Sequence, residues 1–292
     1  MKIIVLGSVK FTSKIIDFLI KKKIFIDGVI GSKKSKYNSD HFDIVKFYKK
    51  KFDGLYTKDI NDKKTYSWIK NKKPDLIFCL GWSKIIRPKI LKIPKLGVIG
   101  YHPQDLPKNK GKHPIIWSLV LGLKNTASTF FFMNSKIDSG SIISKKNIKI
   151  KKYYYAKDLY KRLYLSAQKQ IYKIIIDLKK GKIKNLKQNR SLENIWRKRN
   201  FEDGKIDWRM DAENILNLIK ALSQPYPGAH FFYEKKRFKV WKAEIVNVKE
   251  NNLEPGKIFK KNKLMPIIKC GNKALKLTQF SPKKNFLINS YL

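Results

Sequence analysis

The chain has 292 residues, enough for one or two domains, and we expect two. Its 66 basic and 22 acidic residues give a formal net charge of +44, which is typical of proteins that bind nucleic acid. Only seven of the basic residues are arginine, however, and the lysines are spread over the whole length. Because nucleic-acid sites cluster their basic groups and rely on arginine for bidentate contacts, we attribute the charge to a lysine-rich composition.

The two cysteines argue against a disulfide framework and against a metal site. Cys79 and Cys270 lie far apart in apolar runs, without the spacing of metal ligands. The longest apolar run, residues 115–123, is too short to cross a bilayer. We therefore expect a soluble cytoplasmic protein that does not insert into membranes.

The first half of the chain alternates strands with helices. This alternation of strands and helices predicts an α/β fold with an open, mostly parallel sheet. Residues 32–40 are predicted to form a polar loop. Predicted strands are 1–7, 24–30, 75–80, 97–100 and 128–133, and predicted helices are 11–19, 42–48, 61–70, 115–121 and 155–180.

The pattern changes after residue 182. Residues 183–204 are basic and irregular and are predicted as a linker, followed by a short helix at 212–222. The remaining strands are short and separated by glycine and proline, which indicates a small β-barrel of the OB type. The predicted domains are thus 1–182 and 205–292. The predicted strands of the second are 231–233, 238–241, 245–248, 258–259, 266–269 and 275–277.

One of the four histidines stands in a setting that suggests chemistry. His102 ends an apolar strand, and Pro103 turns the chain there. Open α/β sheets bind their ligands at the carboxyl ends of the strands, so His102 is a candidate catalytic residue. His41 and His230 lie in settings more typical of structural or solvent-facing residues.

Asp138 is the candidate partner of this histidine. It follows the predicted strand 128–133 in an Asp-Ser-Gly sequence, which is also typical of a simple Asx turn. Its significance comes from the surrounding pattern. The five relevant segments are Gly100-Tyr101-His102, Leu106-Pro107, Lys110-Gly111, Pro114-Ile115 and Asp138-Ser139-Gly140.

Together these segments resemble the formyltransferase family that uses 10-formyltetrahydrofolate. That family has a strand ending Asn-x-His, then Leu-Pro, Arg-Gly and Pro-Ile, and Asp-x-Gly after another strand. Residues 202–208, 218–221 and 225–229 extend the resemblance to the branch that formylates nucleotide-linked amino sugars. The resemblance implies a Rossmann-like formyltransferase domain followed by a small β domain.

The resemblance also implies roles for residues around His102. Formyl transfer needs a proton acceptor and a group that stabilises an oxyanion, and a histidine with a pKa near ~6.5 can serve as both. Asp138 would orient the ring and stabilise its charged form. The family's asparagine falls at Gly100, which has no side-chain donor. We expect a water, a backbone N–H or a side chain such as His113 or Tyr101 to replace it; the alternative for His113 is a loop residue bonded to backbone.

The co-substrate implied by the resemblance is 10-formyltetrahydrofolate, without a metal. A pterin is flat and polar at its edge, and suits a slot with apolar walls and backbone hydrogen bonds. Trp82 has an alternative interpretation as core packing. The residues implied in binding are Leu80, Gly81, Trp82, Ser83, Ile85, Ile86 and Asp138.

The leading functional hypothesis is formyl transfer to a nucleotide-linked amino sugar, a step of lipopolysaccharide or surface-polysaccharide biosynthesis. Methionyl-tRNA formyltransferase is the main alternative, disfavoured by Lys110 in place of the family's arginine. A deformylase and a non-catalytic nucleic-acid-binding protein are further alternatives. Sugar-modifying members of the family are often dimers, which makes a homodimer an expectation of the resemblance.

Overall fold

The computed structural model describes residues 1–33, 40–249 and 252–292. The loop predicted at 32–40 lies largely outside the described residues. The chain forms two compact units. Unit 1 comprises residues 1–114, 125–149 and 161–197, and unit 2 comprises residues 115–124, 150–160 and 198–292. Residues 183–197, which were predicted as part of a linker, thus belong to unit 1, and the predicted domain boundaries remain predictions.

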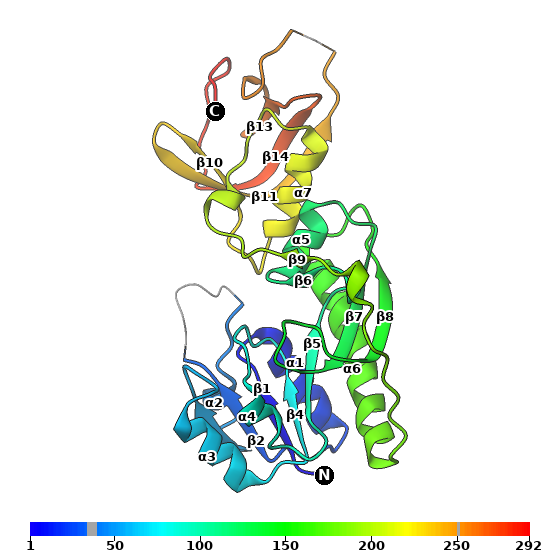
Figure 1. Cartoon of the computed structure of the whole chain (residues 1–292). Helices are drawn as coiled ribbons and strands as arrows, with labels where there is room; N and C mark the ends of the chain where they lie inside the picture. The colour runs from blue at the N-terminus through cyan, green and yellow to red at the C-terminus, as the bar shows by residue number, and fades with distance from the viewer. Residues whose placement is uncertain (34–39, 250–251) are drawn as a thin grey trace. The chain divides into compact units, whose positions relative to one another are not determined.

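Unit 1 is built on a seven-stranded sheet with the strand order β3-β2-β1-β4-β5-β7-β8 (Figure 1). The five strands from β3 to β5 in this order are parallel, and β7 and β8 are antiparallel to their neighbours. This confirms the predicted mostly parallel sheet. The strands are β1 (Ile3–Leu6), β2 (Gly28–Gly31), β3 (Asp53–Tyr56), β4 (Leu76–Cys79), β5 (Val98–His102), β7 (Asn125–Phe132) and β8 (Ile142–Lys149).

Helices cover both faces of this sheet. Helix α6, whose residues from 161 onward belong to unit 1, lies beside α1: the Tyr164 hydroxyl donates to the Lys14 carbonyl at 3.3 Å. The Gln170 amide donates to the Ser128 carbonyl at 3.0 Å and thereby fixes α6 against β7. The helices that include unit 1 residues are α1 (Lys10–Lys21), α2 (Ile44–Phe47), α3 (Lys63–Lys72), α4 (Pro88–Leu91), α5 (Pro114–Val120) and α6 (Ala156–Lys179).

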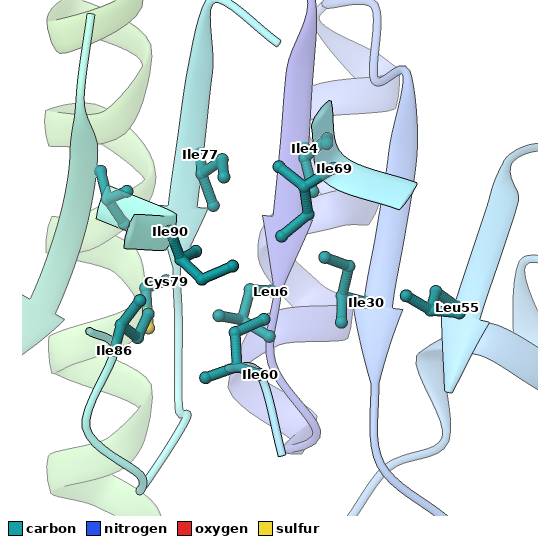
Figure 2. Close-up of a cluster of buried hydrophobic side chains, with 11 residues drawn as sticks. Ile4, Leu6, Ile30, Leu55, Ile60, Ile69, Ile77, Cys79, Ile86 and Ile90 are labelled. Carbon is teal, nitrogen blue, oxygen red and sulfur yellow. The ribbon is translucent and has the colours of Figure 1, made fainter. Parts of the chain in front are cut away.

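The opposite face of the sheet packs a cluster of aliphatic side chains under α3 and α4. Figure 2 shows this cluster, in which side chains from β1, β2, β3 and β4 meet Ile69 of α3 and Ile90 of α4. Burying each such isoleucine contributes about 1.5–3 kcal/mol. The cluster extends to Ile86, which lies in the loop after β4 and packs with Cys79 at the end of that strand.

Unit 2 contains a five-stranded antiparallel sheet in the order β10-β11-β14-β13-β12. The sequence predicted a small β-barrel of the OB type here; the β-rich character is confirmed, and in the described residues the strands form a sheet with β10 and β12 at its edges. Helix α7 (Ala212–Leu222) packs on β11 and spans the residues predicted for it. The strands are β10 (Ala229–Tyr233), β11 (Lys236–Val246), β12 (Ile258–Asn262), β13 (Met265–Lys269) and β14 (Ala274–Ser281).

One of the two edge strands of each sheet is rich in lysine. In unit 1 this is β8, which pairs with β7 and along which Lys145, Lys146 and Lys149 are exposed. In unit 2, β12 holds the same position and carries Lys260 and Lys261. None of the helices in the described residues is sufficiently long and apolar to cross a membrane.

Candidate active site

His102 is the last residue of β5, at the carboxyl end of the parallel part of the sheet. Side chains alternate along a strand, so His102 shares a face with Gly100, whereas Tyr101 points to the other face. The His102 side chain is buried and only 7% exposed. Its two ring nitrogens therefore depend on protein partners.

Both ring nitrogens of His102 have such a partner. Nε2 lies 2.9 Å from the main-chain carbonyl of Asn109, and Nδ1 lies 3.6 Å from Oδ2 of Asp138. A carbonyl can only accept, so Nε2 carries the proton of this bond. Nδ1 is consequently the nitrogen that can gain or lose a proton, and the Asp138 carboxylate faces it. The predicted pair of imidazole and carboxylate is brought together by the fold.

Asp138 is held in a conformation that few residues adopt. Its φ is +45°, in the left-handed region where aspartate is tolerated better than most side chains. The main-chain N–H of Gly111 donates to Oδ2 of Asp138 at 3.1 Å. The Gln188 amide donates to the carbonyls of Asp138 and Gly140 at 2.9 and 2.7 Å. The carboxylate is thus fixed both through its own oxygen and through the backbone of its turn.

Gly140 lets this turn lie directly against β7. A Cβ at residue 140 would lie 1.5 Å from the carbonyl oxygen of Phe132. Because that obstacle is backbone, Gly140→Ala must displace the turn, and we expect it to lower the free energy of unfolding by about 3 kcal/mol. Urea denaturation of the two proteins measures this loss.

Gly181→Ala is the matched control for this substitution. Gly181 also lies in unit 1, with φ of +64° and no atom within 4 Å of an added Cβ. We expect a loss of only about 1–2 kcal/mol there, from backbone strain alone. Equal losses of unfolding free energy in the two variants would show that the close approach of Gly140 to Phe132 does not contribute to the effect.

The space beside Gly100 is filled by apolar side chains. A Cβ at this position would lie 2.9 Å from Met133 Cγ and from the tip of the Phe131 ring. Tyr101 stacks on Phe11 with ring centroids 4.5 Å apart, in the core on the other face of the sheet. His113 lies between β6 (Lys110–Gly111) and α5 with φ of +55°. Which group replaces the family's asparagine stays a prediction.

The predicted cofactor loop starts at the carboxyl end of β4. The strand order reverses between β1 and β4, and open α/β sheets bind ligands at such a switch point. The Trp82 indole Nε1 is buried with no hydrogen-bond partner among the described residues. Lys112 donates to the Ser83 carbonyl and links this loop to the one that follows His102.

The loop also lies near Asp138. Burial raises the pKa of the Cys79 thiol, and the negative charge of Asp138 raises it further, to about 12. The main-chain N–H of Trp82, which bonds to Cys79, acts in the opposite direction. Leu80 and Ile86 are buried, whereas Ile85 is exposed. Gly81 has φ of +74° and faces Val9. Ile86 belongs, with Cys79, to the apolar cluster shown in Figure 2. Trp82 packs against this cluster, as its alternative interpretation expected.

The Lys110-Gly111 segment pairs with a part of the chain that no sequence motif marks. Lys110 and Ile195 belong to a two-stranded parallel ladder, β6 (Lys110–Gly111) with β9 (Ile195–Trp196). Lys110 is 2% exposed and forms an ion pair with Glu193, which holds the pKa of that carboxyl below its usual value. No short motif in the sequence marks Glu193 or Gln188, because their partners are distant along the chain, or Asn109, because it contacts His102 through its main-chain carbonyl.

A cavity of about 330 Å³ lies next to the Asp138 turn. Its walls include both neighbours of Asp138 in the sequence, Ile137 and Ser139. Three of its lining side chains are cationic and one is acidic, so the cavity favours an anionic group. The charged lining residues are Lys110, Lys136, Arg190 and Glu193.

The fold and this site define an α/β protein with a buried histidine facing a half-buried carboxylate near its strand ends. A family model described as formyl transferase matches residues 1–175, and another, described as formyl transferase, C-terminal domain, matches residues 199–292. The chain therefore belongs to the formyl transferase family.

Two curated relatives illustrate the range of this family. The bifunctional polymyxin resistance protein ArnA of Wigglesworthia glossinidia brevipalpis is 38% identical over 80% of this chain. The match spans only 35% of that protein. A methionyl-tRNA formyltransferase of Caldanaerobacter subterraneus subsp. tengcongensis is 33% identical over 72% of this chain and 67% of its own length.

Two solved structures share the fold over nearly the whole chain. WlaRD, a sugar 3N-formyl transferase in the presence of dTDP and 5-N-formyl-THF, has a TM-score of 0.69 at 20% identity, covering 96% of this chain and 98% of that one. An N-formyltransferase of Helicobacter canadensis, in complex with folinic acid and dTDP-3-aminofucose, has a TM-score of 0.69 at 18% identity and covers 95% and 99%. At these identities the likeness concerns the fold.

Proposed function

We propose that this chain transfers a formyl group from 10-formyltetrahydrofolate to the amino group of a nucleotide-linked amino sugar. The observation that carries the proposal is the position of His102 Nδ1, 3.6 Å from the Asp138 carboxylate at the carboxyl end of β5. Acyl transfer to an amine needs a group that removes the amine proton, and Nδ1 is the ring nitrogen that faces the carboxylate while Nε2 is engaged by Asn109.

His102 would move the proton through both halves of the reaction. As the amine nitrogen bonds to the formyl carbon, Nδ1 accepts the surplus proton and the ring becomes an imidazolium. The Asp138 carboxylate stabilises this charge. The ring then returns the proton to the departing nitrogen as its bond to carbon breaks, which leaves an N-formyl sugar and tetrahydrofolate. Because Gly100 offers no side-chain donor, the charged ring is also our candidate for stabilising the oxyanion.

The residues present fit a folate co-substrate, which supplies the formyl group. The indole N–H of Trp82 is a buried donor without a partner in the described ranges of the chain, and it lies in the loop where the family resemblance expects the pterin. We propose that Trp82 and the main chain of Gly81 and Ser83 bind the pterin edge, with Ile85 and Ile86 contributing apolar contacts. Leu80 positions this loop, because its N–H donates to the Leu6 carbonyl and its own carbonyl accepts from Thr12. The relatives solved with folinic acid or 5-N-formyl-THF support this choice.

The acceptor is inferred from two observations. The cavity beside Asp138 has a net positive lining, which suits the phosphates of a nucleotide. Residues 202–208 also match the sugar-nucleotide branch of the family. Methionyl-tRNA is the second candidate acceptor, favoured by the relatives named methionyl-tRNA formyltransferase at 32–33% identity. We also propose a cytoplasmic homodimer that serves surface-polysaccharide synthesis.

A panel of acceptors tests the proposal. Purified protein is offered 10-formyltetrahydrofolate with UDP-, GDP- or dTDP-linked amino sugars, or with aminoacylated initiator tRNA, and release of tetrahydrofolate is followed. We expect turnover with at least one amino sugar, and a formylated sugar identified by mass spectrometry. Turnover with tRNA alone would make the protein a methionyl-tRNA formyltransferase, and folate release without any acceptor would make it a deformylase.

A further inference from the structure

One segment of unit 1 contacts both loops that hold the His102 ring. We call this segment, residues 186–196, the strap. It begins at Leu186, whose backbone exchanges two hydrogen bonds of 2.8 Å with Ile142 at the start of β8. It ends in β9. Residues 183–204 were predicted as a linker, and the part of the strap assigned to the site so far is Arg190, Glu193 and Ile195, which line the cavity beside Asp138.

The strap closes the turn that carries Asp138. The Gln188 side-chain nitrogen donates to the carbonyls of Asp138 and Gly140, at 2.9 and 2.7 Å. Both partners are acceptors, so the nitrogen end of the amide must face the turn. The other end, Oε1, is buried with no hydrogen-bond partner in the part of the chain that the structure describes. The position of Gln188 is thus set by its two bonds to the turn.

The strap also fixes the loop that receives the other side of the His102 ring. The Asn109 N–H donates to Oδ1 of Asn194 at 2.9 Å, and the Lys110 N–H donates to the Asn194 carbonyl at 3.0 Å. Lys110 additionally pairs with Glu193. Asn109, the residue whose carbonyl accepts from His102 Nε2, is therefore bound through its own N–H to the strap.

Both ring partners of His102 need such support. Asp138 and Asn109 have φ of +45° and +61°, in a region that residues other than glycine occupy at a cost of about 1–2 kcal/mol. A turn held at positive φ persists when surrounding contacts fix it. Without Gln188, the carbonyls of Asp138 and Gly140 lose their shared donor, and the turn is free to change the direction of the carboxylate.

We propose that Gln188 is a positioning residue for formyl transfer, which holds the Asp138 carboxylate against His102 by binding the backbone on both sides of Ser139. The inference rests on the proposed function. Gln188 binds the backbone of the turn and contacts neither the substrates nor the reacting atoms. Its loss should consequently lower kcat, because the carboxylate is misplaced, and leave the KM of the folate nearly unchanged.

Two substitutions at one position separate this role from packing. Gln188→Met keeps the length of the side chain and removes both donors, so the carbonyls of Asp138 and Gly140 lose this partner. We expect kcat to fall about 10- to 100-fold and the melting temperature to fall by only a few degrees. Gln188→Lys keeps a donor that can reach both carbonyls, and we expect it to recover most of the lost kcat. Gln168→Met is the control, since Gln168 is half-buried on α6 and donates to Tyr164.

A second measurement tests the inference without using activity. The Gly111 N–H donates to the Asp138 carboxylate. In Gln188→Met its hydrogen exchange, measured by NMR on the intact protein, should become faster than in the wild type and in Gln168→Met. Wild-type kcat together with unchanged exchange at Gly111 would overturn the inference. A wild-type protein that formylates no acceptor would overturn the proposed function instead, while the exchange comparison would still decide the role of Gln188.

Discussion

Replacing His102 with alanine lowers kcat for formyl transfer by about 100- to 10,000-fold, the range that general acid–base catalysis contributes. The reason is geometric: Nδ1 faces the Asp138 carboxylate, and Nε2 is committed to the Asn109 carbonyl. The substitution therefore removes the one ring atom able to carry the amine proton. The measurement is steady-state turnover with the best acceptor of the panel, with circular dichroism to confirm the fold.

His41 provides a matched control for this experiment. Its Nε2 lies 2.9 Å from the Ser32 carbonyl, so it makes the same kind of ring-to-carbonyl contact as His102. His41→Ala therefore costs a comparable hydrogen bond, about 1 kcal/mol, and should keep turnover within a few-fold of the wild type. Near-normal turnover in His102→Ala would exclude the mechanism assigned to the imidazole.

The second large effect is expected at Asp138. Asp138→Asn preserves the size of the side chain and retains an oxygen able to accept from the Gly111 N–H. It removes the negative charge that stabilises the imidazolium. We expect kcat to fall about 100- to 10,000-fold while the melting temperature stays close to that of the wild type. Single-turnover kinetics with saturating folate would separate this loss from weaker binding.

The double variant with His102→Ala and Asp138→Asn tests whether the two groups act as one unit. When two residues act in the same step, removing the second has little further effect once the first is gone. The double variant should therefore be about as slow as the slower single variant. Losses that multiply would instead assign the carboxylate a task independent of the ring. In that case its contact with His102 would be incidental to the reaction.

The sequence located the two ends of the candidate site because both follow strands. His102 ends an apolar strand, and the carboxyl ends of neighbouring strands meet at one edge of a parallel sheet. Asp138 was placed by the turn after β7 and by the family resemblance. Local patterns of this kind predict where a residue enters the site.

The remaining groups were not predictable from local patterns. Asn109 acts through its main-chain carbonyl, which every residue type has. Gln188 bonds to a turn 50 positions away in the sequence, with no intervening periodicity. Similarly, the tight approach of Gly140 to Phe132 depends on the turn folding back on its strand. These contacts arise from tertiary structure, which single-residue propensities do not encode.

The fold shows the same limit in its strands. The predicted strands 238–241 and 245–248 are wrong as separate elements, because β11 runs without interruption from Lys236 to Val246. Its pairing with β14 shifts register between Val240 and Ala243, and this bulge breaks the alternation that marks a strand. Strands β3 and β8 were missed because their exposed outer positions are polar.

The lysine-bearing outer strands β8 and β12 give the unusual composition a physical consequence. An edge strand presents unpaired N–H and C=O groups that can recruit a strand from another molecule, and charged side chains along the edge oppose this by mutual repulsion. If a strand of another copy paired along one of these edges, like charges would come close together. The charges belong to Lys146 and Lys149 on β8 and to Lys260 and Lys261 on β12. Part of the excess positive charge thereby keeps crowded copies of the chain apart.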